Sequence, residues 1–420
     1  ANQSVRIVVM GCAAVVNKQA YSSLQQVFAV VSSVKELLQI LELPHSSSNV
    51  LPPPPSKAQS LNDELPVINS PPNVLIPHFH ERTRAFLAIQ NGCDNHCSFC
   101  ITRLARGKSV SFPVSQILEQ AKVFANTAGI NEITITGINI SSFNYDNCTL
   151  GRLILLLLAE LPERVRLRIS SLDPANIYQV TERIDGRSLE AQAQSCVRRT
   201  AQTEHRNDEP ANFRWFGIDD NIFVALENPR VLPHLHFSVQ SGDDTILRRM
   251  GRRHTRAMVE ELVRAVRHIR RDISLGCDII CGFPTETDEM FSQTVDLVRE
   301  CQIPLLHVFP YSDRPGTSAS LMTPKVPKNV KNERAAVLRS LGREILLDRL
   351  KGFVGQEVNF LAEKWKDGFL LGTTDHFFKI CVTVAKVSPQ TFSGSEIGQV
   401  LQAKVLGVNR DCLTLVGQLI

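Results

Sequence analysis

Short apolar runs alternate with longer stretches of helical periodicity from residue 81 onward. Six runs rich in β-branched and aromatic residues have the length of strands. They cover Arg84–Gln90, Glu132–Asn139, Arg164–Leu172, His234–Gly242, Leu275–Phe283 and Leu305–Ser312. Helical spacing follows in stretches such as Pro113–Gly129 and Glu286–Cys301. Repeated βα units predict an α/β fold with a parallel sheet, either open and doubly wound or a partial barrel, and both place ligands at the carboxyl ends of the strands.

The segments on either side of this region have a different pattern. Residues 1–43 predict a strand and a helix, too little for a core, and because the chain starts without Met we expect the remnant of a truncated α/β domain. Residues 44–80 are rich in Pro and Ser and predict a linker. Residues 318–352 contain a long amphipathic stretch that predicts a connecting helix. Residues 353–420 hold short, closely spaced strand-like runs, which predict a small β-barrel.

One polar stretch interrupts the βα pattern. Residues 178–217 are charged and poorly periodic, and they separate the third predicted strand from the helix that should follow it. A loop of this length is uncommon inside a compact domain. We therefore interpret it as an insertion within a barrel domain that covers residues 81–317.

Composition excludes several classes of protein. The chain has 420 residues, 43% of them hydrophobic, and no apolar run reaches the roughly 20 residues that span a bilayer. Its first residues lack the features of a secretory signal, so we expect a cytoplasmic protein with no membrane partner. The net charge is only +4, although basic residues gather in Arg248–His254 and Arg267–Asp272. Eleven cysteines in such a chain indicate metal binding rather than a disulfide framework.

Cys93, Cys97 and Cys100 follow directly on the first predicted strand. A structural zinc ion needs four ligands, and the next cysteine, Cys148, lies beyond a predicted helix and strand. We expect the side chain of His96 to point away from a shared metal. The set fits a [4Fe-4S] cluster that is held by three thiolates and keeps one iron open. A zinc knuckle, or three buried thiols without metal, remains an alternative.

A C-x3-C-x2-C motif after the first strand of a βα barrel resembles that of the radical S-adenosylmethionine (radical SAM) enzymes. The resemblance implies a partial (β/α)6 barrel of the TIM type. It also implies that the open iron binds SAM, whose reductive cleavage gives a 5′-deoxyadenosyl radical. On this interpretation no protein residue serves as a catalytic acid or base, and the electron comes from a reductase or a ferredoxin- or flavodoxin-type donor.

Further motifs between Arg82 and Thr317 resemble those of the methylthiotransferases within that superfamily. They are "RTRAFLAIQNGCDNHCSFC", "ARGKS", "EITITGINISSF", "RLRISSLDP", "PHLHFSVQSGDDTILRRMGRRHT", "DIICGFPTET" and "HVFPYSDRPGT". The third and the last are most similar to the threonylcarbamoyladenosine tRNA methylthiotransferases. The resemblance implies tRNA as the partner and a methylthio group added at C2 of the modified adenosine beside the anticodon.

The same resemblance implies that polar residues at the ends of the second, third and fourth predicted strands contact SAM or the substrate. They are Thr136, Gly137, Asn139, Ser170, Ser171 and Gln240. Each of them can instead be a strand-end cap or a turn former, and the same alternatives apply to Asp278. We expect His234, His236 and His307, which lie within strand-like runs, to be hydrogen-bonded structural residues rather than metal ligands.

The β-rich tail resembles the TRAM domain of the same family, a small RNA-binding barrel. The resemblance implies that its basic and aromatic residues bind tRNA phosphates and stack on bases. These residues include Lys364, Lys366, His376, Phe377, Phe378 and Lys379. The alternative is that they are ordinary residues of a small barrel.

The sequence also departs from the family pattern. Members carry a second [4Fe-4S] cluster on three N-terminal cysteines, of which only Cys12 has a counterpart here, so sulfur insertion lacks two ligands in this sequence. Thr102–Leu104 replaces the usual Ile-Pro-Tyr. Alternative substrates are isopentenyl-adenosine in tRNA and a ribosomal-protein aspartate. The alternative from another class is a non-catalytic tRNA-binding remnant.

Overall fold

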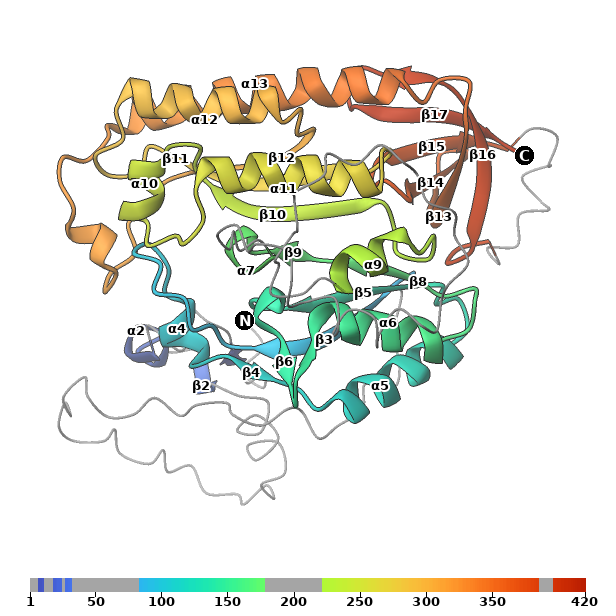
Figure 1. The fold of residues 1–420 in the computed structure, drawn as a ribbon, viewed down its shortest axis with the longest axis horizontal. Helices are drawn as coiled ribbons and strands as arrows, with labels where there is room; N and C mark the ends of the chain where they lie inside the picture. Colours follow the sequence, from blue (N-terminus) through green and yellow to red (C-terminus); the bar gives the residue numbers. More distant parts are fainter. Residues whose placement is uncertain (1–6, 11–17, 25–26, 32–82, 178–220, 385–395) are drawn as a thin grey trace, which may run out of the picture.

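The computed structural model describes residues 7–10, 18–24, 27–31, 83–177, 221–384 and 396–420 (Figure 1). Its main body is built on two four-stranded sheets, in the orders β4-β3-β5-β8 and β12-β11-β10-β9. Every strand pair in them is parallel except the pair formed by β4 at the edge. The strands are β3 (Ala85–Asn91), β4 (Val110–Ser111), β5 (Glu132–Gly137), β8 (Arg166–Ile169), β9 (Ser171–Leu172), β10 (His234–Gln240), β11 (Ser274–Cys281) and β12 (Leu305–Pro310).

The third predicted strand joins the two sheets. It is divided at Ser170 into β8, which pairs with β5, and β9, which pairs with β10. The Ser170 N–H still donates to the Ile135 carbonyl, at 3.1 Å. All six predicted strands are therefore present in one parallel series, which confirms the partial-barrel prediction.

Helices connect the strands and cover them on the outside (Figure 1). Thr255 caps the amino end of α11 and Thr287 that of α12, each through a side-chain oxygen that accepts a backbone N–H. In the described ranges, no helix combines the length and the apolarity that crossing a bilayer requires. The helices of this region are α4 (Thr102–Arg106), α5 (Val114–Asn126), α6 (Leu150–Glu160), α7 (Pro174–Ile177), α9 (Asn221–Glu227), α10 (Asp244–Arg249), α11 (Arg256–Ile269), α12 (Asp288–Glu300) and α13 (Lys328–Lys351). Two 3-10 turns are η1 (Ile140–Ser142) and η2 (Ser318–Leu321). A small hairpin is formed by β6 (Asn144–Tyr145) and β7 (Cys148–Thr149).

The N-terminal segment forms a separate strand pair. β1 (Ile7–Met10) and β2 (Val27–Val31) are parallel, with α2 (Lys18–Ser22) between them in the chain. The expected strand and helix are both present. Cys12, the predicted linker at 44–80 and the predicted insertion at 178–217 lie outside the described residues.

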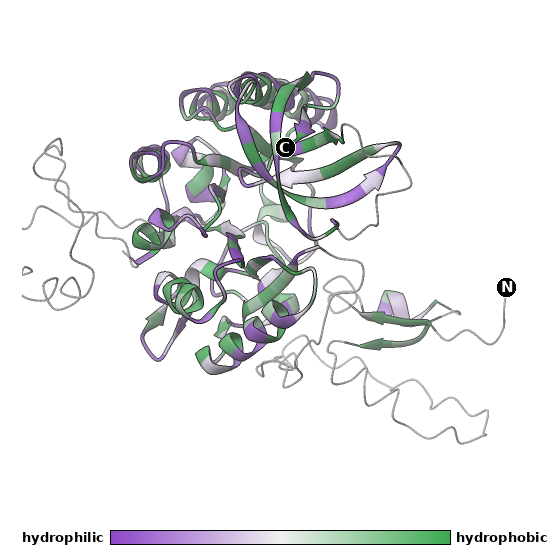
Figure 2. Ribbon diagram, turned by 90° about the vertical axis from the view of Figure 1, so that its right-hand side faces the viewer, coloured by the Kyte–Doolittle hydropathy of each residue, from purple (hydrophilic) through white to green (hydrophobic). Residues whose placement is uncertain are grey.

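The tail forms a closed five-stranded barrel in the order β13-β14-β15-β17-β16, as predicted. Buried residues such as Phe360, Leu370 and Phe378 fill its interior. Figures 1 and 2 show it beside the main body, at the end of α13. Its strands are β13 (Glu357–Lys366), β14 (Phe369–Thr374), β15 (Lys379–Thr383), β16 (Val400–Asn409) and β17 (Thr414–Leu419).

A buried ionic cluster lies where the two barrels meet. The fully buried Glu132, at the start of β5, accepts from Arg168 Nε at 2.7 Å and lies 3.4 Å from Arg84 Nε and 3.5 Å from Arg166 Nη2. Burial works to raise the pKa of Glu132, but the charge and the hydrogen bond of Arg168 prevail and lower it. Arg166 and Arg168 also bind Asp375 of the C-terminal barrel.

Aromatic residues complete this interface. Phe377 stacks on His234 with 4.6 Å between ring centroids, and the Arg168 guanidinium lies 4.9 Å from the same ring. His376 Nε2 is 3.1 Å from Asp272 Oδ2, and Phe378 is buried in the barrel core. The burial of Phe378 contradicts the prediction that it binds RNA, whereas RNA binding by the half-buried His376 and Phe377 stays a prediction. Sequence alone could not separate an exposed aromatic from one that fills an interface.

Replacing Glu132 by Gln should lower the free energy of unfolding by about 3–5 kcal/mol, because three guanidinium groups lose their buried counter-charge. Urea denaturation followed by circular dichroism measures the change. The matched control is Glu160→Gln, which removes a pair with Lys122 on an exposed surface and should cost less than about 1 kcal/mol. Equal effects of the two substitutions would contradict a structural role for Glu132.

Candidate cluster and substrate site

The three predicted cluster ligands lie on the loop that leaves the carboxyl end of β3. Gly92 has φ +72, and a Cβ there would lie 1.9 Å from the Lys108 carbonyl oxygen. The Cys93 N–H donates to the carbonyl of Gly107, at 3.1 Å. Glycine at position 92 therefore lets the two ends of the cysteine loop meet, so that the loop forms a closed turn over the strand ends.

Each of the three thiols has at least one N–H group directed at its sulfur. The Asn95 N–H lies 3.4 Å from Cys93 Sγ, the Thr102 N–H lies 3.4 Å from Cys100 Sγ, and Arg252 Nη1 lies 3.5 Å from Cys97 Sγ. Such N–H donors stabilise negative charge on sulfur. The surroundings therefore fit sulfurs that bind as thiolates.

Burial raises the pKa of the Cys93 and Cys97 thiols, and for Cys97 the charge of Arg252 opposes this effect. These two thiols need positive charge nearby to ionise at neutral pH, and bound iron supplies it.

Asp173 and Arg252 hold this loop against the strands. Asp173, directly after β9, accepts from Asn95 Nδ2 at 2.8 Å and from Arg252 Nη2 at 3.1 Å. Arg252 also donates to the Ser238 carbonyl of β10, at 2.7 Å. Burial would raise the pKa of Asp173, but hydrogen bonding to His254 and the charge of Arg252 lower it to about 2. The carboxylate is therefore ionised at neutral pH and pairs with Arg252.

The basic segment Arg248–His254 thus has a structural role that the sequence did not indicate. The Ser98 N–H donates to the Met250 carbonyl at 2.9 Å, and Gly251, at φ +72, leaves no room for a Cβ beside the His96 carbonyl. The motif "LDP" after the third strand and the arginines of "RRMGRRH" were the only signals in the sequence. The His96 side chain is exposed beside Arg103, and the prediction that it is not a ligand stays a prediction.

The expected contacts of SAM or substrate lie at the carboxyl ends of the strands. Gly137 ends β5, where a Cβ would come within 2.8 Å of the Gln90 carbonyl oxygen. The Asn139 N–H donates to Gln90 Oε1 at 2.9 Å, and Asn139 Nδ2 is 4.0 Å from Cys93 Sγ. Thr136, also at the end of β5, is half-buried. The second strand thus brings Asn139 next to the cysteine loop.

The remaining predicted contacts of SAM or substrate lie at the ends of the third and fourth predicted strands. Ser170 and Ser171 are half-buried at the division of the third strand, and the hydroxyls of Ser171 and Ser238 lie 2.8 Å apart. Gln240 ends β10 in the left-handed conformation, φ 72, and is buried. Their roles in ligand binding stay predictions.

A cavity of about 490 Å³ opens beside the cysteine loop. This volume is typical of small-molecule sites. Asn139 is the one predicted ligand contact among its lining residues, and the two serines of the lining, Ser141 and Ser142, carry no signal of that role in the sequence. The lining residues include Asp94, Asn95, His96, Asn139, Ser141, Ser142, Phe143 and Arg253.

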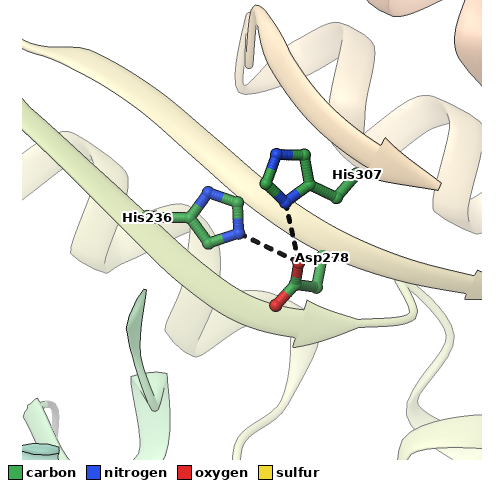
Figure 3. A group of neighbouring side chains, drawn as sticks. All are labelled: His236, Asp278 and His307. Atoms are coloured by element: carbon green, nitrogen blue, oxygen red, sulfur yellow. Dashed lines mark hydrogen bonds and ion pairs between the residues drawn. The ribbon is translucent and has the colours of Figure 1, made fainter. Parts of the chain in front are cut away.

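Two of the three strand histidines make the hydrogen bonds that were expected of them. His236 and His307 both bind Asp278, at 3.1 and 3.3 Å (Figure 3). His234 differs, because neither ring nitrogen has a hydrogen-bond partner in the described part of the chain. Burial moves the pKa of His234 well below its usual value, so this ring is neutral and stacks on Phe377.

Comparison with known proteins identifies the family. The model of the radical SAM superfamily matches residues 212–298. A threonylcarbamoyladenosine tRNA methylthiotransferase, MtaB, of Rickettsia prowazekii is 34% identical over 99% of this chain and 84% of its own length. The chain belongs to the threonylcarbamoyladenosine tRNA methylthiotransferase family. It is therefore a radical SAM tRNA methylthiotransferase, with a [4Fe-4S] cluster and SAM as cofactors.

More distant relatives have related names. The MtaB of Thermotoga maritima is 28% identical over 98% of this chain and 81% of its own length. A tRNA-2-methylthio-N(6)-dimethylallyladenosine synthase of Ehrlichia canis is 27% identical over 98% of this chain and 83% of its own. Proteins named for two different modified bases thus share similarity with nearly the whole chain.

Arg252→Met should lower the iron that the chain retains, since it removes the donor to Cys97 and the partner of Asp173. Loss of such an outer contact typically weakens metal binding about 10–100-fold. Iron and acid-labile sulfide per chain, measured after anaerobic reconstitution and desalting, report the effect. Arg248→Met, in the same segment but exposed, is the matched control and should keep the wild-type iron content. Equal iron in both variants would contradict the proposed contact.

Proposed function

We propose that this chain adds a methylthio group to C2 of N6-threonylcarbamoyladenosine beside the anticodon of tRNA. The observation that carries the proposal is the 34% identity over 99% of the chain to a relative named for that base. The motifs "TGINISSF" and "HVFPYSDRPGT" resemble this subgroup and agree with that match.

The residues of the cysteine loop have the donor set for this chemistry. Cys93, Cys97 and Cys100 would hold the [4Fe-4S] cluster, which supplies the electron that cleaves SAM when both are bound. Their N–H donors stabilise the thiolates, and the pair formed by Asp173 and Arg252 fixes the loop over the strand ends. Asn139 would orient SAM at the edge of the adjacent cavity, where it already lies beside Cys93.

Two further parts of the proposal rest on the family resemblance. Cys12 would be one ligand of a second cluster that provides the inserted sulfur. A reductase or a protein of the ferredoxin or flavodoxin type would supply electrons.

The end of the β13–β14 hairpin is the part of the C-terminal barrel best suited to bind tRNA. Lys364 and Lys366 are exposed there, and Trp365 and Phe369 are 37% and 38% exposed. Lysines next to exposed aromatic rings are suited to phosphate contacts and base stacking. Lys379, also expected to bind RNA, is paired with Glu363 at 3.2 Å. We therefore assign tRNA binding to the hairpin and not to the turn at Asp375–Phe378.

The competing substrate is a dimethylallyl-adenosine in tRNA, which the name of the Ehrlichia canis relative favours. The two products differ in mass, so analysis of tRNA nucleosides separates them.

Cells that carry the gene should contain 2-methylthio-N6-threonylcarbamoyladenosine, and cells without it should lack this nucleoside. In cells, Cys93→Ala should abolish the product. In reconstituted protein it should abolish 5′-deoxyadenosine, whereas Cys12→Ala should still form 5′-deoxyadenosine but give no methylthio product. Mass spectrometry measures both compounds. A gain of the dimethylallyl product alone would support the competing substrate. Bound tRNA without any 5′-deoxyadenosine would indicate a non-catalytic protein.

The double substitution Lys364→Ala/Lys366→Ala should weaken tRNA binding several-fold. It should also reduce the slope of log K against log salt by about 1–2, because two phosphate contacts are lost. Filter binding at several salt concentrations measures both quantities. Lys122→Ala, a lysine on helix α5, is the control and should leave the slope unchanged. An unchanged slope in the double variant would place the tRNA elsewhere.

A further inference from the structure

Three neighbouring parallel strands each contribute one side chain that can bind metal, apart from the cysteine loop. His236 lies on β10, Asp278 on β11 and His307 on β12. Figure 3 shows both imidazole rings pointing to one oxygen of the carboxylate. His236 Nε2 is 3.1 Å and His307 Nδ1 is 3.3 Å from Asp278 Oδ1. These three atoms all lie within 4.8 Å of one another.

The strand register explains this convergence. Asp278 is the direct neighbour of His307, whereas His236 is paired with Gly276, two residues earlier on β11. His236 therefore reaches Asp278 with Nε2, the nitrogen far from its backbone, and His307 uses the near nitrogen Nδ1. A Cβ at position 276 would lie 2.5 Å from His236 Nδ1. Glycine at that position is what allows the imidazole of His236 to lie where it does.

The distances between the ligand atoms of these three side chains match those around one small metal ion. Ligand atoms about 2.0–2.2 Å from a metal lie about 3.0–3.5 Å apart in octahedral or tetrahedral geometry. The distances of 3.1 and 3.3 Å fall in that range. Two imidazoles and one carboxylate are a donor set that suits zinc and non-haem Fe(II), and three protein ligands leave coordination positions open.

The surroundings leave the group open to an ion. On β11, Asp278 alternates with Cys277 and Ile279, both fully buried in the core, so its carboxylate points to the other face of the sheet. The His307 side chain is 59% exposed, whereas those of His236 and Asp278 are 12% and 23% exposed. Among the described residues, the second carboxylate oxygen of Asp278 has no hydrogen bond, so it is available to a ligand or a water molecule.

We propose that His236, Asp278 and His307 bind a single divalent transition-metal ion, Zn²⁺ or Fe²⁺, at a site separate from the cysteine loop. Two neutral imidazoles and one carboxylate leave the bound ion with a net positive charge. An oxygen or nitrogen of a small ligand can fill its open positions. The site stands on this geometry alone and does not depend on the identity of the modified base.

The test uses Zn²⁺ as the probe, on the full-length chain. The reconstituted enzyme is compared with a Cys93→Ala/Cys97→Ala/Cys100→Ala variant, in which zinc cannot occupy the loop. Zinc per chain is measured after equilibrium dialysis against a competing chelator. We expect about one zinc per chain at this site in both proteins, and at least a tenfold loss of affinity in Asp278→Asn and in His307→Asn. His268→Asn, an exposed histidine on α11, is the matched control and should bind zinc normally.

Two further measurements separate metal binding from a general loss of structure. Gly276→Ala removes no ligand but displaces His236, so it should weaken zinc binding while circular dichroism shows a folded chain. Co²⁺ bound to the variant without Cys93, Cys97 and Cys100 should show the weak visible bands of nitrogen and oxygen ligands without thiolate charge transfer.

Zinc binding that is the same in Asp278→Asn, His307→Asn and the His268→Asn control would overturn the proposal. No retained zinc in the variant without Cys93, Cys97 and Cys100 would overturn it as well. Neither result depends on the tRNA product, so failure of this site and failure of the proposed methylthiolation can be told apart.

Discussion

The arrangement of the whole molecule depends on one buried carboxylate. Glu132 begins β5 and is surrounded by Arg84, Arg166 and Arg168, which come from the two strands beside it. A charge without solvent is costly unless opposite charges and hydrogen bonds surround it. The same arginines continue to Asp375 and Glu363 of the C-terminal barrel. A single network of charges thus connects neighbouring strands of the sheet to the C-terminal barrel.

The amino and carboxyl ends of the parallel strands carry residues with different roles. The amino ends carry the ionic cluster and the stacked aromatic residues of the barrel interface. The carboxyl ends carry the cysteine loop, the pair formed by Asp173 and Arg252, and the cavity beside Asn139. This division follows the general organisation of βα barrels, in which one end provides stability and the other provides chemistry. It also explains why many polar residues are buried here without being part of the reaction site.

Local patterns predicted the elements well, because each depends on neighbouring residues. The six strands, the long helix before the tail and the five-stranded barrel follow from periodicity, and the cluster ligands follow from spacing within eight residues. Contacts between distant segments were not predictable. Arg252 lies 79 residues from Asp173, and Phe377 meets His234 across two domains. Nothing near either residue in the sequence indicates its partner, so neither the interface contact of Phe377 nor the structural role of Arg252 follows from the sequence.

The docking of the tail has a mechanical consequence. Phe377 between His234 and Arg168, together with the ion pairs of Asp375, fixes the C-terminal barrel at two kinds of contact, one stacked and one charged. These contacts oppose movement of the barrel relative to the strands that carry the cysteine loop. The hairpin at Lys364–Phe369 is part of that barrel, so it keeps a defined position relative to the loop.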